Sequence, residues 1–227
     1  MKHRSLRLRS AHLVCALVLG VAIIPANVFA QPGGGKQLKV EGIPYTWQAS
    51  SNAVSPVSGP GNTLTFGAGS GTDLHYPATG AYRRNNAPMV LFTPLGDFEF
   101  SARVIPRFEG QYDGGALLLY SDTLQWAKIL LQLSGSRALV GMSVVRSGVT
   151  DDAYYPAADP GSIYFKISRS GKLYSFYTST DGKVWVTTRQ FVYESLAPVQ
   201  VGFYAQSPVG KGSHVVFSDI VFKTMKP

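Results

Sequence analysis

Cysteine is almost absent from this sequence of 227 residues, since Cys15 is the only one. No disulfide can form within a single chain, so the fold must depend on the burial of apolar side chains. Apolar runs of membrane-spanning length are absent as well, because the run at residues 13–24 is too short and no later run is longer. Helical periodicity is also lacking, which disfavours an α-helical fold.

The N-terminal segment predicts a secretory signal peptide. Residues 1–10 carry four Lys or Arg side chains and no acidic one, apolar residues follow, and Val28-Phe29-Ala30 is typical of a cleavage site. We expect cleavage near Ala30 and a secreted or periplasmic mature protein. A lipid anchor on Cys15 is disfavoured, because residues 12–14 lack the small residue expected before a lipidated cysteine.

Clusters of basic side chains are scarce. Of the 21 Lys and Arg residues, 17 remain after the four in the signal peptide are removed, and they face 13 acidic residues. The resulting net charge of about +4 is mild, and Arg83-Arg84 is the only basic pair that stands out. We therefore expect no binding to nucleic acid, which requires a denser basic surface.

Short strand-like runs separated by Gly, Pro, Ser and Asp fill most of the sequence. Strands are predicted at residues 45–48, 63–66, 89–93, 98–105, 116–121, 126–134, 139–146, 163–168, 173–179, 184–190, 199–206 and 215–223. This spacing is typical of an all-β sandwich. Residues 31–42 are predicted to form a flexible tether and residues 43–227 one domain, with irregular segments at residues 50–61 and 74–88.

Residues 114–134 predict two adjacent strands with different chemistry on their two faces. Period-two alternation places one set of side chains in the core, namely Ala127, Ile129, Leu131 and Leu133. It places the other set on the opposite face, namely Trp126, Lys128, Leu130 and Gln132. The second set combines an aromatic ring, an ammonium group and an amide, as a ligand-binding surface does.

Several motifs in fixed order resemble a known bacterial family. They are GDFEF at residues 96–100, GGALLLYSDTLQWAKILLQL at 114–133, STDGKVW at 179–185, VGFYAQSP at 201–208 and FSDIVF at 217–222. Over residues 45–222 the chain resembles domain of unknown function family 1349. The resemblance implies a concanavalin A-like jelly roll of two antiparallel sheets. The same domain is similar to the C-terminal sandwich module of xylosidase-type glycoside hydrolases, where it lies beside a sugar-cleaving domain.

In such a jelly roll the outward side chains of the concave sheet line a groove. Strand parity places there Tyr120, Trp126, Lys128, Gln132, Arg146, Tyr204 and Gln206. Aromatic rings that stack on sugar C–H faces, beside amides and cations that pair with hydroxyls, favour a secreted, non-catalytic module that binds a polysaccharide or oligosaccharide. Two alternatives stay open: an ordinary exposed face, and an accessory surface that docks on another secreted protein. The segment at residues 74–88 either contacts the ligand through Tyr82, Arg83 and Arg84 or plugs the groove.

Catalysis has weaker support, and no catalytic residue is assigned. A glycosidase needs a carboxylate pair, but Asp97 and Glu99 lack the E-x-D-x-x-E pattern, and Asp151-Asp152 is predicted to lie in a solvated turn. Outside the signal peptide only two histidines remain, His75 and His214. An unrecognised glycoside hydrolase or lyase is the third alternative.

No cofactor is expected, apart from a structural calcium ion that Asp219 in FSDIVF would help to bind, as the resemblance implies. One carboxylate does not suffice for an ion that takes six to eight oxygen ligands. The alternative is that Asp219 accepts hydrogen bonds at an irregularity of its strand.

Overall fold

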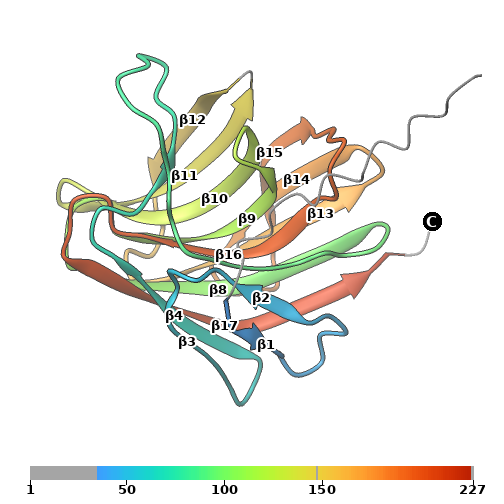
Figure 1. Ribbon diagram of the computed structural model, residues 1–227. Coiled ribbons are helices and arrows are strands. Elements are labelled where there is room, and N and C mark those ends of the chain that lie inside the picture. The colour runs from blue at the N-terminus through green and yellow to red at the C-terminus, as the bar shows by residue number, and fades with distance from the viewer. Residues whose placement is uncertain (1–34, 147, 226–227) are drawn as a thin grey trace, which may run out of the picture.

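Apolar residues at every second position build two antiparallel sheets that pack face to face (Figure 1). The structure is a computed structural model that describes residues 35–146 and 148–225. The predicted signal peptide at residues 1–30 lies outside the described residues. Within the described part of the chain no helix is long and apolar enough to cross a membrane.

The first sheet contains eight strands within the described residues and carries the candidate site. In spatial order they are β1 (Gln37–Leu38), β2 (Trp47–Ala49), β7 (Met89–Phe92), β16 (Gln200–Gln206), β9 (Gly114–Asp122), β10 (Gln125–Ser134), β11 (Arg137–Arg146) and β12 (Val149–Pro156). Strands β9, β10 and β11 pair as successive antiparallel neighbours. The predicted two-strand unit at residues 114–134 is therefore confirmed, and it lies at the centre of the site.

The second sheet contains seven strands over the same described ranges. In spatial order they are β15 (Val186–Val192), β14 (Leu173–Ser179), β13 (Ile163–Ser170), β8 (Phe98–Arg107), β17 (Gly212–Thr224), β4 (Thr63–Gly69) and β3 (Val54–Gly59). A separate small hairpin consists of β5 (Leu74–His75) and β6 (Arg84–Asn85). This hairpin belongs to neither large sheet, and it decides the shape of the site.

The main core fills the space between the two sheets, and the predicted parity of β10 is confirmed. Ile129 and Leu131 are fully buried in this core, whereas Leu133 near the strand end is only half-buried. The rings of Trp47 and Phe203 stack in the same core with centroids 5.1 Å apart. Burial of this aromatic and aliphatic surface is the main stabilising contribution in a fold whose described part has no cysteine.

Three expectations about the chain were wrong because edge strands lack apolar alternation. Residues 151–152 lie in the edge strand β12 and not in a turn, and residues 54–59 of an expected loop form the edge strand β3. Gln37–Leu38, within the expected tether, pairs with β2, and Leu38 is buried in the core. An edge strand is exposed on one side and needs few apolar residues, so its sequence resembles that of a loop.

Candidate functional site

The segment at residues 72–76, hereafter the crossing segment, runs across the outer face of the eight-stranded sheet. At one side Thr72 forms a backbone bridge with Ser207, directly after β16. At the other side Tyr76 exchanges hydrogen bonds of 2.9 Å with Thr150 of β12, through its amide and its carbonyl oxygen. Figure 1 draws the loop that continues from this segment in teal, beside β11 and β12. The crossing segment therefore spans the sheet from β16 to β12.

A second apolar cluster lies beneath the crossing segment and the residues that follow it. Leu74, Tyr76 and Ala87 are buried there against Trp126 and Tyr204. The rings of Tyr76 and Trp126 meet edge to face with centroids 5.9 Å apart. The segment at residues 74–88 therefore covers this half of the concave face, while its Tyr82 and Arg84 line a cavity beside the covered part.

The expected open groove is accordingly corrected. Trp126 and Tyr204 have no exposed surface, and Lys128, Gln132 and Gln206 retain 3%, 7% and 3%. Strand parity placed all five on the predicted face, but parity says nothing about a loop from elsewhere in the chain that covers that face. An exposed stacking role for Trp126 or Tyr204 is therefore wrong.

One further predicted site residue, Tyr120, is not among the residues that line the remaining cavity. Tyr120 is half-buried against the second apolar cluster. Arg146 ends β11, and its side chain lies outside the described residues. Met142 and Val144, the alternate residues that precede Arg146 on β11, are buried in the core between the sheets.

A cavity of about 510 Å³ remains on the other side of the crossing segment. It is lined by Asp73, His75, Tyr82, Arg84, Tyr112, Lys128, Leu130, Gln132, Ser134, Leu139, Tyr154, Gln206, Pro208 and Val209. Lys128, Gln132 and Gln206 are the predicted site residues among them. Three tyrosines and several aliphatic side chains form apolar walls, and a few polar groups converge between them. Small-molecule sites commonly combine these features at volumes of about 300–1,000 Å³.

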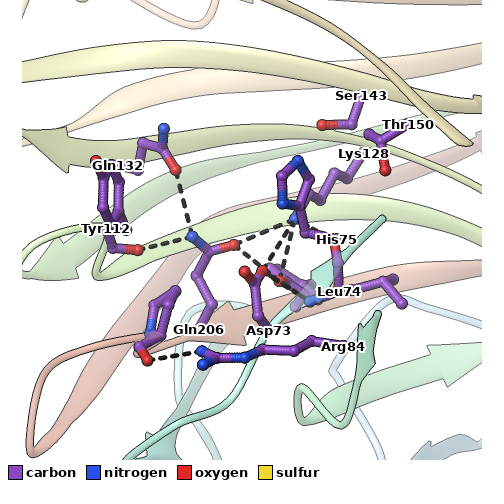
Figure 2. A network of polar contacts seen from close by, with 12 residues as sticks. Asp73, Leu74, His75, Arg84, Tyr112, Lys128, Gln132, Ser143, Thr150 and Gln206 are labelled. Carbon is purple, nitrogen blue, oxygen red and sulfur yellow. Dashed lines mark hydrogen bonds and ion pairs between the residues drawn. The ribbon is translucent and has the colours of Figure 1, made fainter. Parts of the chain in front are cut away.

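The buried ammonium group of Lys128 organises the floor of the cavity (Figure 2). It donates hydrogen bonds to Leu74 O at 2.8 Å, to the Tyr204 hydroxyl at 3.1 Å and to Gln206 Oε1 at 3.2 Å. The Asp73 carboxylate lies 3.7 Å away. Burial lowers the pKa of Lys128, and the negative charges of Asp73 and Asp152 partly oppose this shift.

The side chains of Tyr204 and Gln206, which complete the floor of the cavity, are also fixed by hydrogen bonds. The Tyr204 hydroxyl accepts a hydrogen bond from Leu74 N at 2.9 Å and lies 2.8 Å from Gln206 Oε1. Burial, followed by the negative charge of Asp73, raises the pKa of Tyr204, so this hydroxyl stays protonated. Gln206 Nε2 donates to Tyr112 O at 2.7 Å and to Gln132 Oε1 at 3.3 Å (Figure 2). The floor is therefore rigid before any ligand arrives.

One wall contains a chain of hydrogen bonds that starts behind the cavity. Asp152 accepts a hydrogen bond from Ser143 Oγ at 2.6 Å and lies 3.1 Å from His75 Nε2. The other ring nitrogen of His75 lies 3.0 Å from the Tyr82 hydroxyl. Burial alone would raise the pKa of Asp152, but the hydrogen bonds from His75 and Ser143 together lower it. The resulting carboxylate, imidazole and phenol series can bind polar groups or transfer a proton.

The phenol of Tyr154 stands on the β12 side of the cavity. Burial, with the negative charges of Asp152 and Asp73, raises the pKa of Tyr154. Its hydroxyl therefore stays protonated near neutral pH and is able to donate a hydrogen bond to a ligand.

Sequence reasoning missed Asp73, His75, Tyr112 and Tyr154, and it placed Asp152 in a solvated turn. None of these residues lies on a strand with clear apolar alternation. The available signal was composition, since residues 73–84 bring Asp, His, Tyr and Arg together without an apolar period. Such a segment is a candidate for contact with a site when it must cross a sheet.

The carboxylates of Asp97, Glu99 and Asp219, candidates for catalysis or calcium, lie away from the cavity. Glu99 pairs with Lys166 at 3.2 Å on the other sheet, and Asp97 Oδ1 accepts from Gly171 N at 2.8 Å. Asp219 sits at a register shift of β17 with a φ of 51°, where it accepts a hydrogen bond from the Tyr164 hydroxyl. Within residues 35–146 and 148–225 no group of three or more His, Cys, Asp or Glu side chains is placed to hold a metal ion.

Several solved structures are similar to this chain. A functionally unknown protein from Saccharomyces cerevisiae matches with a TM-score of 0.72 and 19% identity, over 81% of this chain and 97% of that one. GH43B of the xyloglucan PUL from Bacteroides ovatus matches with a TM-score of 0.61 and 14% identity, over 84% of this chain and 38% of that one. The alginate lyase from Klebsiella pneumoniae matches with a TM-score of 0.51 and 11% identity, over 76% of this chain and 85% of that one. These likenesses confirm the predicted jelly-roll sandwich.

No curated protein matches the sequence. This chain spans little more than a third of the Bacteroides ovatus protein, so the likeness covers one part of that molecule. A family model described as "Protein of unknown function (DUF1349)" matches residues 47–225. This range includes both large sheets except β1, and it contains every residue that lines the cavity. The chain belongs to the DUF1349 family.

Proposed function

We propose that this protein is a secreted, non-catalytic module that binds carbohydrate in the cavity beside the crossing segment. The observation that carries this proposal is the composition of the cavity. Tyr82, Tyr112 and Tyr154 line it together with the hydrogen-bonding groups of His75 and Gln132. Sugars present apolar C–H faces and a rim of hydroxyl groups, so they suit an aromatic wall with a few placed polar groups.

The rigidity of the floor supports binding without a large entropic cost. Lys128, Gln206 and Tyr204 hold one another through hydrogen bonds, so their side chains lose little freedom when a ligand enters. Residues on the rim are freer, since Tyr112 and Tyr154 are 45% and 47% exposed. Recognition would therefore rest on stacking at the rim and on polar contacts deeper in the cavity.

The similar structures guide the choice of probes. One is named for xyloglucan and another for alginate, and the family resembles modules of xylosidase-type enzymes. The first panel is therefore xyloglucan, xylan and alginate, each as polymer and as short oligosaccharides. Binding is measured by isothermal titration calorimetry for the oligosaccharides and by pull-down for the polymers.

Tyr154→Ala tests the site directly. Loss of a stacking ring is expected to weaken binding about fivefold or more, since aromatic contacts contribute roughly 1 kcal/mol beyond buried area. The matched control is Tyr164→Ala, which removes a tyrosine from β13 of the other sheet. Equal affinity of Tyr154→Ala and the parent protein would count against the site. Absence of binding across the whole panel, with one stable protein partner recovered instead, would favour an accessory module that docks on another secreted protein.

A second candidate function is favoured by the Asp152, His75 and Tyr82 series. In hydrolysis of a glycosidic bond, water adds across the bond between C1 and the leaving oxygen, its hydroxyl going to C1 and a proton to that oxygen. His75 or Tyr82 would supply the proton, because Asp152 with its lowered pKa is ionised. The assay measures reducing ends released from the same polymers. Release that is lost in His75→Gln would establish catalysis, and no release from any polymer leaves the binding function.

A further inference from the structure

We infer that the cavity receives the end of a carbohydrate chain and not its interior. This inference rests on the proposed function and specifies the form of the ligand. It follows from the way that the crossing segment and the β5–β6 hairpin divide the concave face of the eight-stranded sheet.

A chain bound along its interior needs a groove that is open at both ends. The concave face would offer such a groove along β9 and β10, but the crossing segment lies across both strands. The ammonium group of Lys128 in β10 donates a hydrogen bond of 2.8 Å to Leu74 O of the crossing segment. Trp126, two residues before Lys128 on the same strand, has no exposed surface. A sugar chain that enters over Gln132 is therefore stopped at the crossing segment.

A second contact closes the cavity towards β16. Arg84 of the hairpin donates a hydrogen bond from Nη1 to Pro208 O at 2.8 Å. Its guanidinium group also lies over the ring of Tyr82, 5.5 Å from the centroid. The hairpin is thus tied to the loop that follows β16.

The gradient of exposure shows where the cavity opens. Asp73, Lys128 and Gln206 at the crossing segment are 7%, 3% and 3% exposed, whereas the three lining tyrosines Tyr82, Tyr112 and Tyr154 are 45%, 45% and 47% exposed. The buried end carries the charged and hydrogen-bonding groups, and the exposed end carries aromatic rings. The cavity is therefore a recess with a polar closed end.

The chemistry of a sugar chain matches this arrangement. A terminal residue has a free hydroxyl where an interior residue has a glycosidic bond to the next sugar. At the closed end that hydroxyl would meet the Tyr82 hydroxyl, which the His75 ring holds in place while Asp152 holds the far nitrogen of that ring. An interior residue would instead direct its next sugar into the crossing segment.

The experiment varies the number of chain ends at constant sugar mass. Each polymer of the panel that binds is shortened by partial acid hydrolysis, and the affinity is expressed per mass of sugar. Shortening the mean chain tenfold raises the number of ends tenfold, so the apparent dissociation constant should fall about tenfold. An unchanged or weaker affinity of the shortened material would overturn the inference while leaving carbohydrate binding intact.

Two variants test whether the recognised end of the sugar chain lies in the recess. His75→Gln at the closed end is expected to weaken binding of the shortened fragments and of the polymer alike, at least tenfold, because both bind through their ends. Tyr164→Ala on the other sheet should change neither value. Unchanged affinity of the shortened fragments for His75→Gln would contradict the inference. No binding of polymer or fragments by the parent protein would overturn the proposed function itself, and the inference with it.

Discussion

The ammonium group of Lys128 donates a 2.8 Å hydrogen bond to the backbone carbonyl oxygen of Leu74, 54 residues earlier in the chain. This contact joins the middle of β10 to the crossing segment and turns an exposed sheet face into the floor of a closed recess. A charged group is rarely fully buried unless it is paired and hydrogen-bonded, and Lys128 meets both conditions. The shape of the candidate site therefore depends on a polar contact between distant parts of the chain.

Lys128→Met is expected to lower the free energy of unfolding by about 3 kcal/mol, because it leaves the buried carboxylate of Asp73 without its cation. Urea denaturation of the parent and the variant measures the difference. Addition of Asp73→Asn should restore part of the loss, since it removes the uncompensated charge. The control is Lys172→Met, whose ammonium group pairs with Glu194 at an exposed position and should have no measurable effect. A loss of unfolding free energy no greater than that of Lys172→Met would show that Asp73 does not depend on Lys128 as its cation.

Tyr204→Phe is expected to lower the free energy of unfolding by about 1–3 kcal/mol. The substitution keeps the ring but removes a hydroxyl that is bonded to Leu74 N, Lys128 and Gln206. Thermal and urea unfolding are the measurements. Tyr45→Phe serves as the control, because the hydroxyl of Tyr45 accepts only one hydrogen bond near the surface, from Leu95 N, among the contacts found in the described chain. Equal effects of the two substitutions would argue against a buried network around Tyr204.

Asp152 predicts a pH dependence of stability. Its pKa in the folded protein is lowered, so its contribution is fully present above the unfolded value of about 3.9 and is lost as the pH falls through the folded value. Stability measured between pH 6 and about pH 3 should therefore fall less steeply in Asp152→Asn than in the parent protein. Identical slopes would show that Asp152 has the same pKa in the folded and unfolded chains.

Gly202→Ala tests the close pairing of β16 with β7. A Cβ atom at residue 202 would lie 2.1 Å from Val90 O, which belongs to the backbone and cannot move independently. We expect a loss of about 1–3 kcal/mol in the free energy of unfolding, or failure to fold. The matched control is Gly69→Ala, since a Cβ atom there meets no atom within 4 Å. A Gly202→Ala protein as stable as this control would contradict the pairing.

Much of the sandwich could be predicted from residue patterns alone. Alternation of apolar and polar side chains identified the central strands and the inward residues Ile129 and Leu131, because the period of a strand is local and needs no knowledge of its neighbours. Edge strands β3 and β12 escaped this reasoning, since one of their sides faces solvent and requires no apolar residue. Asp152 was misplaced for the same reason.

The sequence by itself determined which side chains share a face of β10, so that Trp126, Lys128 and Gln132 lie opposite Ile129. Only the tertiary structure decided that this face is covered at Trp126 and open beside Gln132. The physical reason is that parity is set within a strand, whereas coverage depends on where the crossing segment binds. That position is set by long-range contacts of Thr72 with Ser207, of Leu74 with Lys128 and of Tyr76 with Thr150, which no local pattern encodes.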